Sequence, residues 1–320
     1  MFNNQPESHR PDTKHTPTFK SLLDLVGVST RKPFDPVHER DASLMRPVTS
    51  GAKTPAPVLS LPELRNIIKS NPESTVIVSD LHGYVELLEH VMNELEIRRN
   101  GGNRTVRVGS IGDLIDGRTD GDTKTLQFAA KELDFLVAGN HEVAFMGGPR
   151  FGGMPDSDPQ QLGVALHELV EREILVAAQE ICGVLLTHAG VNTAYARSDA
   201  KTTAAFLNNE WQTFLASPKL RCNVLRTPAG LLASSPLRSG GSLSDLSSAI
   251  PPGCLWQAWE ELLLKYPKTF RQIIGHSPRG TIEASLDDVL INIDAAGYRL
   301  GIAVITKEKQ VILGSDFKTP

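Results

Sequence analysis

Five short stretches of the sequence place acidic, amide or imidazole side chains beside glycine. In chain order they are Asp80-Leu81-His82-Gly83, Gly112-Asp113-Leu114-Ile115-Asp116, Gly139-Asn140-His141-Glu142, His188-Ala189-Gly190 and Gly275-His276-Ser277. Carboxylate oxygens and imidazole nitrogens in this mixture suit divalent manganese, iron or zinc. Each stretch is therefore a candidate source of metal ligands or of a proton carrier.

A strand-like segment precedes each of these stretches. The segments span residues 74–79, 105–111, 135–138, 184–187 and 271–274. Active sites of open α/β sheets collect at such strand ends, and Gly112 lets the backbone turn there. A single Asp-Gly pair or a single histidine is ordinarily a turn or core residue, so the prediction rests on all five stretches together.

Helices are expected between the strands. Ser60, followed by Pro62, predicts a helix start. Apolar residues at helical spacing predict helices over 84–99, 123–133 and 255–266. Further helices are expected over 161–172 and 204–216. The alternation of strands and helices predicts an α/β fold. Two strands over 177–187 are expected to form a hairpin, and segments 289–294, 300–306 and 310–313 a closing antiparallel meander.

Two regions are expected to differ from this regular body. Residues 1–57 are rich in proline, serine, threonine and charge, which predicts a largely disordered tail. Within it, residues 21–28 could form a short helix that docks on the body or on a partner protein. Residues 58–320 are expected to form one domain. Within that domain, periodicity loosens over 191–253, and this region is expected to cover a cleft and to select substrate.

The composition narrows the classes of partner and location. The chain of 320 residues is 40% hydrophobic and 22% charged, an ordinary globular balance. The formal net charge is -4, so the chain lacks the excess of positive charge that is typical of proteins that bind nucleic acid. No apolar run approaches the roughly 20 residues that span a bilayer, and the start lacks a secretory signal. The three cysteines share no CxxC spacing, which favours reduced thiols and a cytoplasmic location.

The ordered blocks DLHG, GDLID, GNHE, HAG and GHS resemble the calcineurin-like metallophosphoesterases, and within them the phosphoprotein-phosphatase (PPP) branch. The resemblance covers about residues 75–313. It implies a four-layer α/β/β/α sandwich with two mixed β-sheets, and a catalytic domain over 58–320. Ser79 stands where the family commonly has glycine, and Ala138 where eukaryotic protein phosphatases carry arginine. Ser79 is a small change at a crowded strand end, whereas Ala138 favours a bacterial-like or otherwise divergent member.

The resemblance also implies a site for two divalent metal ions, with manganese the first expectation and iron or zinc as alternatives. It implies that Asp80, His82 and Asp113 hold one ion. Asp113 would bridge to the second ion, which it would hold together with Asn140, His188 and His276. Two carboxylates against two divalent ions leave a positive site that attracts a phosphate dianion.

Further residues resemble the family's catalytic and substrate-binding groups. His141 resembles the proton donor to the leaving oxygen, and Asp116 would orient it and keep it cationic. Glu142 would support the ligand geometry. Arg118 and Arg238 are the expected phosphate-binding residues, because a planar guanidinium matches phosphate. Arg238 is preferred to Arg221 and Arg226, because the glycines that follow it allow close backbone approach. The family has Asp-Arg-Gly where this sequence has Asp-Gly-Arg, so Arg118 either reaches phosphate from a shifted position or is a solvated surface residue.

Three functions follow from these expectations. The resemblance favours a metal-dependent serine/threonine protein phosphatase, in which a hydroxide bridging two metals attacks phosphorus in line. The second function is hydrolysis of a dinucleoside polyphosphate of the diadenosine tetraphosphate type, or of another small phosphate. The third, suggested by the shifted Arg118, is a catalytically weak phosphate-binding scaffold protein.

Overall fold

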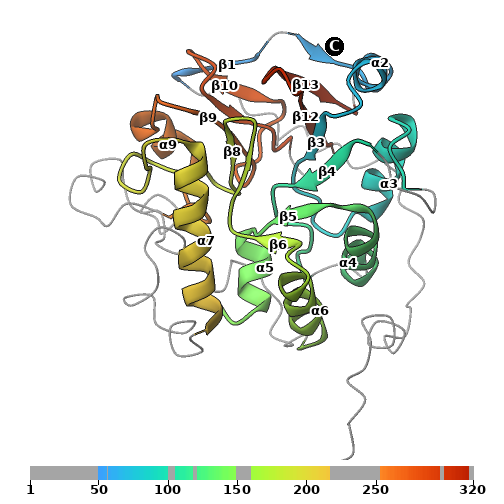
Figure 1. Cartoon of the computed structure of the whole chain (residues 1–320), viewed down its shortest axis with the longest axis vertical. Helices are drawn as coiled ribbons and strands as arrows, with labels where there is room; N and C mark the ends of the chain where they lie inside the picture. The colour runs from blue at the N-terminus through green and yellow to red at the C-terminus, as the bar shows by residue number, and fades with distance from the viewer. Residues whose placement is uncertain are drawn as a thin grey trace, which may run out of the picture.

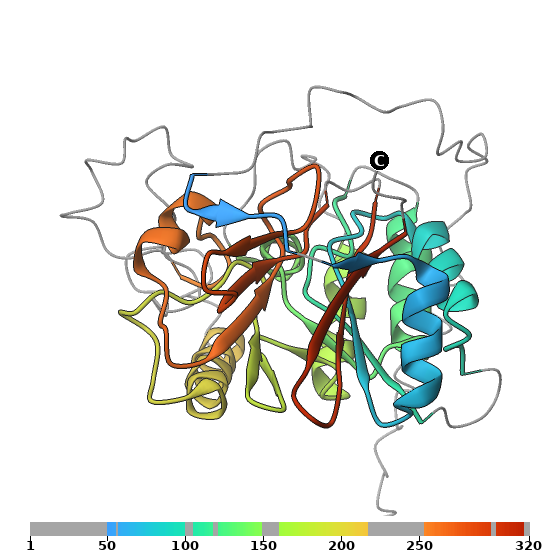
Figure 2. The same ribbon diagram turned by 90° about the horizontal axis from the view of Figure 1, so that it is seen from above.

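The computed structural model describes residues 50–55, 57–99, 105–117, 121–148, 160–216, 253–295 and 299–316. They form two β-sheets that pack face to face, with helices on the outer side of each sheet (Figures 1 and 2). The predicted α/β/β/α sandwich with two mixed sheets is confirmed. No helix in these residues is long and apolar enough to cross a membrane.

The larger sheet has seven strands. Their order across the sheet is β2 (Val58–Leu59), β13 (Val311–Ser315), β12 (Gly301–Ile305), β3 (Thr75–Val78), β4 (Arg107–Ser110), β5 (Phe135–Val137) and β6 (Leu175–Val176). Strands β3 to β6 run parallel to one another, whereas β12 is antiparallel to both of its neighbours. The carboxyl ends of β3, β4 and β5 therefore share one edge of this sheet.

The smaller sheet has six strands. Their order is β1 (Ala52–Lys53), β10 (Glu283–Ser285), β11 (Leu290–Asn292), β9 (Arg271–Ile274), β8 (Val184–Leu186) and β7 (Gln179–Ile181). Strands β8, β9 and β11 are parallel, and the remaining pairs are antiparallel. The expected hairpin before His188 is confirmed as β7 and β8.

The helices divide between the two outer faces. Helices α2 (Leu61–Ser70), α3 (Val85–Glu94), α4 (Gly121–Glu132) and α6 (Gln160–Glu171) lie on the side of the larger sheet. Helices α7 (Ala200–Ala216) and α9 (Trp259–Lys265) lie on the side of the smaller one (Figure 2). A short helix, α5 (Asn140–Phe145), begins directly after β5.

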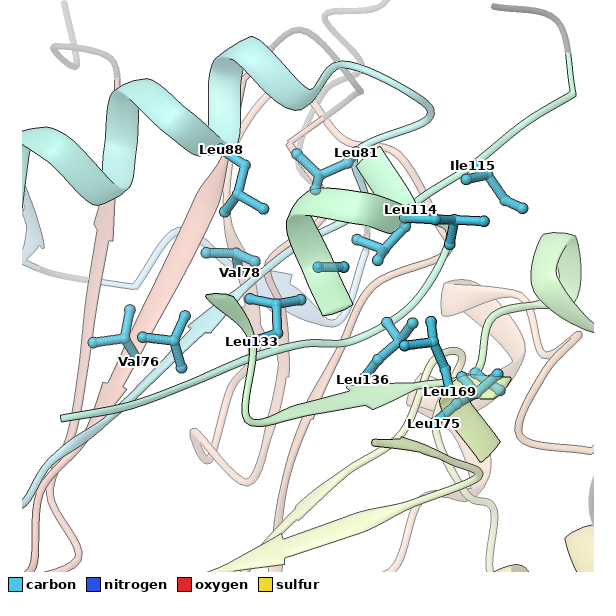
Figure 3. Close-up of a cluster of buried hydrophobic side chains, with 14 of the residues drawn as sticks. Val76, Val78, Leu81, Leu88, Leu114, Ile115, Leu133, Leu136, Leu169 and Leu175 are labelled. Carbon is cyan, nitrogen blue, oxygen red and sulfur yellow. The ribbon is translucent and has the colours of Figure 1, made fainter. Parts of the chain in front are cut away.

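The side chains of β3 alternate between the two faces of the larger sheet and so pack against both neighbouring layers. Val76 and Val78 pack under the helices against residues such as Leu88 (Figure 3). Ile77 points the other way and packs between the sheets with Ile273 and other residues of the smaller sheet. Successive strand side chains point to opposite faces, and parallel strands are apolar on both. Each such buried side chain contributes on the order of 2 kcal/mol, which fixes the register of the strand.

Three helix boundaries differ from their predicted positions by four residues or more, and one of them is the start of α7, which lies at Ala200 rather than at residue 204. Helix α3 ends at Glu94 rather than Arg99, because Glu96 adopts a positive φ of 57°. The N–H of Ile97 then donates to the carbonyl of Met92, a hydrogen-bond pattern that closes a helix end. Helix α9 begins at Trp259 rather than Leu255. By contrast, Ser60 starts α2 as predicted, with its N–H donating to Glu63 over 2.8 Å.

Three expectations about chain organisation need correction or completion. The last three strands do not form one meander, since β11 lies in the smaller sheet whereas β12 and β13 form a hairpin in the larger. Residues 52–53, in the predicted tail, form β1 and pair with β10. The region 191–253 contributes α7 to the body, while its residues 217–252 lie outside the described residues.

Candidate metal centre

Four candidate ligands lie at one edge of the larger sheet. Asp80 and His82 follow β3, Asp113 follows β4, and Asn140 is the first residue of α5. The loops after β3 and β4 are joined, because the N–H groups of Leu81 and His82 both donate to the carbonyl of Asp113, over 3.0 and 2.8 Å. This connection holds the two aspartates and His82 in one loop cluster.

His188 connects this edge with the smaller sheet. It follows β8, and its Nε2 lies 3.0 Å from Oδ1 of Asn140, 2.9 Å from Nδ1 of His276 and 3.4 Å from Oδ2 of Asp113. Its Nδ1 lies 2.9 Å from the carbonyl oxygen of Ile111, which can only accept, so Nδ1 carries a proton. The four residues expected to hold the second ion therefore converge on one point.

Asp113 lies between two groups of ligand atoms. One group contains Asp113, His188 and His276, and the other contains Asp113, His82 and His141, with the atoms of each group within 4.8 Å of one another. Oδ2 of Asp113 is 3.8 Å from Nε2 of His141. A carboxylate shared by two groups is the arrangement needed to bridge two cations. The second group contains His141, which the sequence assigns to proton transfer, in place of Asp80.

Asp80 is held against the loop of His276. The N–H of His276 donates to Oδ2 of Asp80 over 2.9 Å. The other oxygen, Oδ1, is buried and has no hydrogen-bond partner among the described residues. A Cβ added at Gly275 would overlap this oxygen, so glycine is what lets the loop approach it. A buried, unpaired carboxylate oxygen is costly, and a cation beside it removes that cost.

Glu142 organises the backbone around Asp113. Its Oε2 accepts the N–H groups of Gly139 and Asp113, each over 2.8 Å, and its Oε1 accepts that of Leu114 over 2.8 Å. Because Glu142 lies in the first turn of α5, it ties the loop after β4 to the loop after β5. The supporting role expected for Glu142 agrees with these contacts.

Three of the candidate ligands have strained backbones. The φ angles of His82, Asp113 and His276 are 47°, 48° and 67°, in the left-handed region that residues with a Cβ rarely adopt. Such strain costs on the order of 1–3 kcal/mol at each position and persists where the surrounding structure enforces it. Three of the eight non-glycine residues with a positive φ in the described part of the chain are candidate ligands, and strain of this kind is found at functional sites.

Residues 74–280 match the sequence profile of the calcineurin-like phosphoesterases, which is more than half of the chain. The chain belongs to this family. Calcineurin-like phosphoesterases act on phosphoric esters at a centre of two divalent metals, and the donor set described above fits such a centre. The convergence of the imidazoles on Asp113 and the unpaired Oδ1 of Asp80 are the observations that support this fit.

Several solved structures resemble this phosphoesterase. A putative diadenosine tetraphosphatase is 16% identical, with coverage of 78% of this chain and 96% of that chain and a TM-score of 0.43. The cold-active protein-tyrosine phosphatase of the psychrophile Shewanella sp. is 13% identical, with coverage of 75% and 80% and a TM-score of 0.48. A protein serine/threonine phosphatase from Saccharomyces cerevisiae is 13% identical, with coverage of 79% and 83% and a TM-score of 0.43. No functionally curated protein matches the sequence significantly.

Burial and neighbouring charges determine which histidines of the metal-free phosphoesterase are protonated. Burial disfavours a charged His188, but Asp113 outweighs burial and raises the pKa of His188 to about 9. Burial lowers the pKa of His141 to about 4, against the opposing effect of Asp113. His188, rather than the neutral His141, is therefore the charged partner of Asp113.

Of the predicted catalytic and phosphate-binding residues, the structure describes His141 and Asp116. Nδ1 of His141 lies 3.0 Å from the carbonyl oxygen of Ile115. The sequence predicted a cationic ring, but burial lowers the pKa of His141 in the metal-free structure and disfavours that form. Asp116 is buried nearby, and its N–H donates to Oδ1 of Asp122 over 3.1 Å. Its orienting role stays a prediction. Arg118 and Arg238 lie outside the described residues.

Two buried carboxylates at this site are absent from the predicted set. Asp122, in the first turn of α4, accepts the N–H groups of Asp116 and Gly117 and so shapes the turn after Asp113. Asp294 follows β11 and lies near enough to Asp80 to raise its pKa. For Asp294 a signal was present, because it is the last residue of the predicted strand 289–294, and Asp80 and Asp113 also lie at the ends of predicted strands.

Proposed function

We propose that the chain hydrolyses phosphate monoesters, and that its substrates are phosphoserine or phosphothreonine residues of proteins. The observation that supports this proposal best is Asp113, whose carboxylate lies within 4.8 Å of imidazole nitrogens in two separate groups. The five ordered motifs, which resemble the PPP branch, support the choice of protein substrate.

Six side chains would hold two divalent ions at this place. They are Asp80, His82, Asp113, Asn140, His188 and His276. Ions bound there would supply Lewis acidity toward a phosphate group and activate water. The protein contributes a fixed donor set, because loop hydrogen bonds and the contacts of Glu142 hold the ligands before any ion arrives.

His141 is proposed to handle the proton of the leaving group. Its Nδ1 is occupied by the carbonyl of Ile115, which orients the ring and leaves Nε2 toward Asp113. Nε2 is then the atom that exchanges a proton with the leaving oxygen. Asp116 is proposed to support this group from the loop that follows Asp113.

The hydrolytic activity can be tested with p-nitrophenyl phosphate and added Mn²⁺. Asp113→Asn removes the bridging charge and is expected to lower turnover by orders of magnitude. Asp288→Asn is a matched control, because Asp288 lies in the turn before β11 and pairs with Lys53 over 2.7 Å. Wild-type turnover in Asp113→Asn would overturn the proposal.

The substrate class needs its own comparison. The metal-reconstituted protein should be supplied with a phosphoserine peptide, a phosphothreonine peptide and diadenosine tetraphosphate. The proposal predicts a higher kcat/KM for the peptides. A higher kcat/KM for diadenosine tetraphosphate would assign the same centre to nucleotide hydrolysis. Phosphate binding without turnover would indicate a scaffold protein.

A further inference from the structure

Asp294 lies beside His276 at the carboxyl end of the smaller sheet. Strands β9 and β11 are parallel, with Asn292 opposite Ile274, and the N–H of Ile293 donates to the carbonyl of Ile274 over 2.9 Å. Asp294 lies two residues beyond Asn292 and His276 two residues beyond Ile274, so both follow the carboxyl ends of neighbouring parallel strands. Asp294 is only 2% exposed. A carboxylate is therefore buried next to a candidate metal ligand.

The backbone of Asp294 is fixed to the loop that carries His276. Its carbonyl accepts the N–H of Arg279 over 3.0 Å, and its own N–H donates to Oδ1 of Asn292 over 2.9 Å. Nδ2 of Asn292 in turn donates to the carbonyl of Ser277 over 2.8 Å. These bonds tie both sides of Asp294 to residues 277–279, so its backbone cannot move away from the site without breaking them.

Asp294 acts electrostatically on Asp80. Burial raises the pKa of Asp80 well above its ordinary value, and Asp294 is the next cause, ahead of Asp113. Two buried carboxylates near each other repel strongly, because the interior screens charge poorly. Since Oδ1 of Asp80 has no hydrogen-bond partner in the described part of the chain, the pair is arranged for a cation rather than for the metal-free state.

We propose that Asp294 is a third carboxylate of the metal centre, which strengthens cation binding on the side of Asp80 and lowers the stability of the metal-free fold. This inference rests on the metal centre proposed above. With Asp80, Asp113 and Asp294 ionised, two divalent ions leave a site charge of roughly +1 rather than +2. Asp294 acts through the field at the site and need not contact the substrate.

The test compares Asp294→Asn with the wild type and with Asp288→Asn, in thermal melting and Mn²⁺ titration calorimetry. Asp288 is the matched control, since it precedes the same strand and lies at the opposite end of it from Asp294. Asp294→Asn preserves size and removes one charge. It is expected to raise the metal-free melting temperature by about 2–4 °C. It should also weaken Mn²⁺ binding by about tenfold or more, while Asp288→Asn binds as the wild type does.

Each other outcome counts against the inference. Equal Mn²⁺ affinity in Asp294→Asn and the wild type would overturn it and leave the metal centre intact. A metal-free Asp294→Asn that melts below the wild type would show that the carboxylate serves the fold, and would also overturn it. A wild type that binds no Mn²⁺ would overturn both this inference and the proposed function.

Discussion

Asp80 and His276 join the two sheets at the site, through a hydrogen bond of 2.9 Å from the N–H of His276 to Oδ2 of Asp80. Asp80 follows β3 in the larger sheet, and His276 follows β9 in the smaller sheet. The bond spans 196 positions of sequence. The two halves of the donor set are therefore held at a fixed separation before an ion binds, which favours binding because less order must be imposed later.

Two substitutions at Asp80 separate this hydrogen bond from the charge. Asp80→Asn keeps an oxygen acceptor for the N–H of His276, whereas Asp80→Ala leaves that buried donor unpaired, at a cost of about 1–3 kcal/mol. We expect Asp80→Ala to melt several degrees below Asp80→Asn without metal, and both to lose most of the stabilisation by Mn²⁺. Differential scanning calorimetry measures both effects. Equal melting temperatures for the two variants would show that the bond does not support the fold.

Gly275 is expected to be essential for metal binding for a steric reason. An added Cβ would overlap Oδ1 of Asp80, so Gly275→Ala must displace the carboxylate or the loop. We predict that Gly275→Ala loses the rise in melting temperature that Mn²⁺ produces in the wild type. Gly183→Ala is the control, because a Cβ there meets nothing within 4 Å, although its φ of 85° adds strain. A normal Mn²⁺ response in Gly275→Ala would contradict the close approach.

Asp316 is expected to make stability depend on pH. Burial raises the pKa of Asp316 to about 6, although Oδ1 of Asp316 accepts the N–H of Leu300 over 3.0 Å. Between pH 4 and 6 the folded state therefore binds more protons at this group than the unfolded state, so stability falls as pH rises. The loss amounts to on the order of 2 kcal/mol.

The variant Asp316→Asn isolates this effect, since the amide oxygen still accepts from Leu300 but does not titrate. Urea unfolding at pH 4, 5, 6 and 7 should show a shallower decline of the free energy of unfolding in the variant than in the wild type. Parallel curves for the two proteins would rule out Asp316 as a source of the pH dependence.

Much of the site was predictable because its residues follow strands in short, ordered motifs. Strand β3 shows the apolar run and the polar end that place Asp80, and β9 does the same for His276. The sheet that contains β11 was not predictable from periodicity. Residues 290–292 are buried on both faces, as are those of β12, so neither strand shows a pattern that assigns it to one sheet.

Asp294 illustrates the same limit for the site. No glycine or histidine adjoins it, so sequence pattern alone reads it as a strand end. Only the parallel pairing of β9 with β11 brings it to the same end of the sheet as His276. The proton state of His141 likewise depends on burial and on Asp113, which no local motif contains.

The most direct test of the central claim is a crystal structure with Mn²⁺, in which anomalous scattering locates the ions. The account predicts two peaks, one on each side of Asp113, with His82 at the first and His188 and His276 at the second. A single peak that does not contact Asp113, or no peak at saturating Mn²⁺, would contradict it.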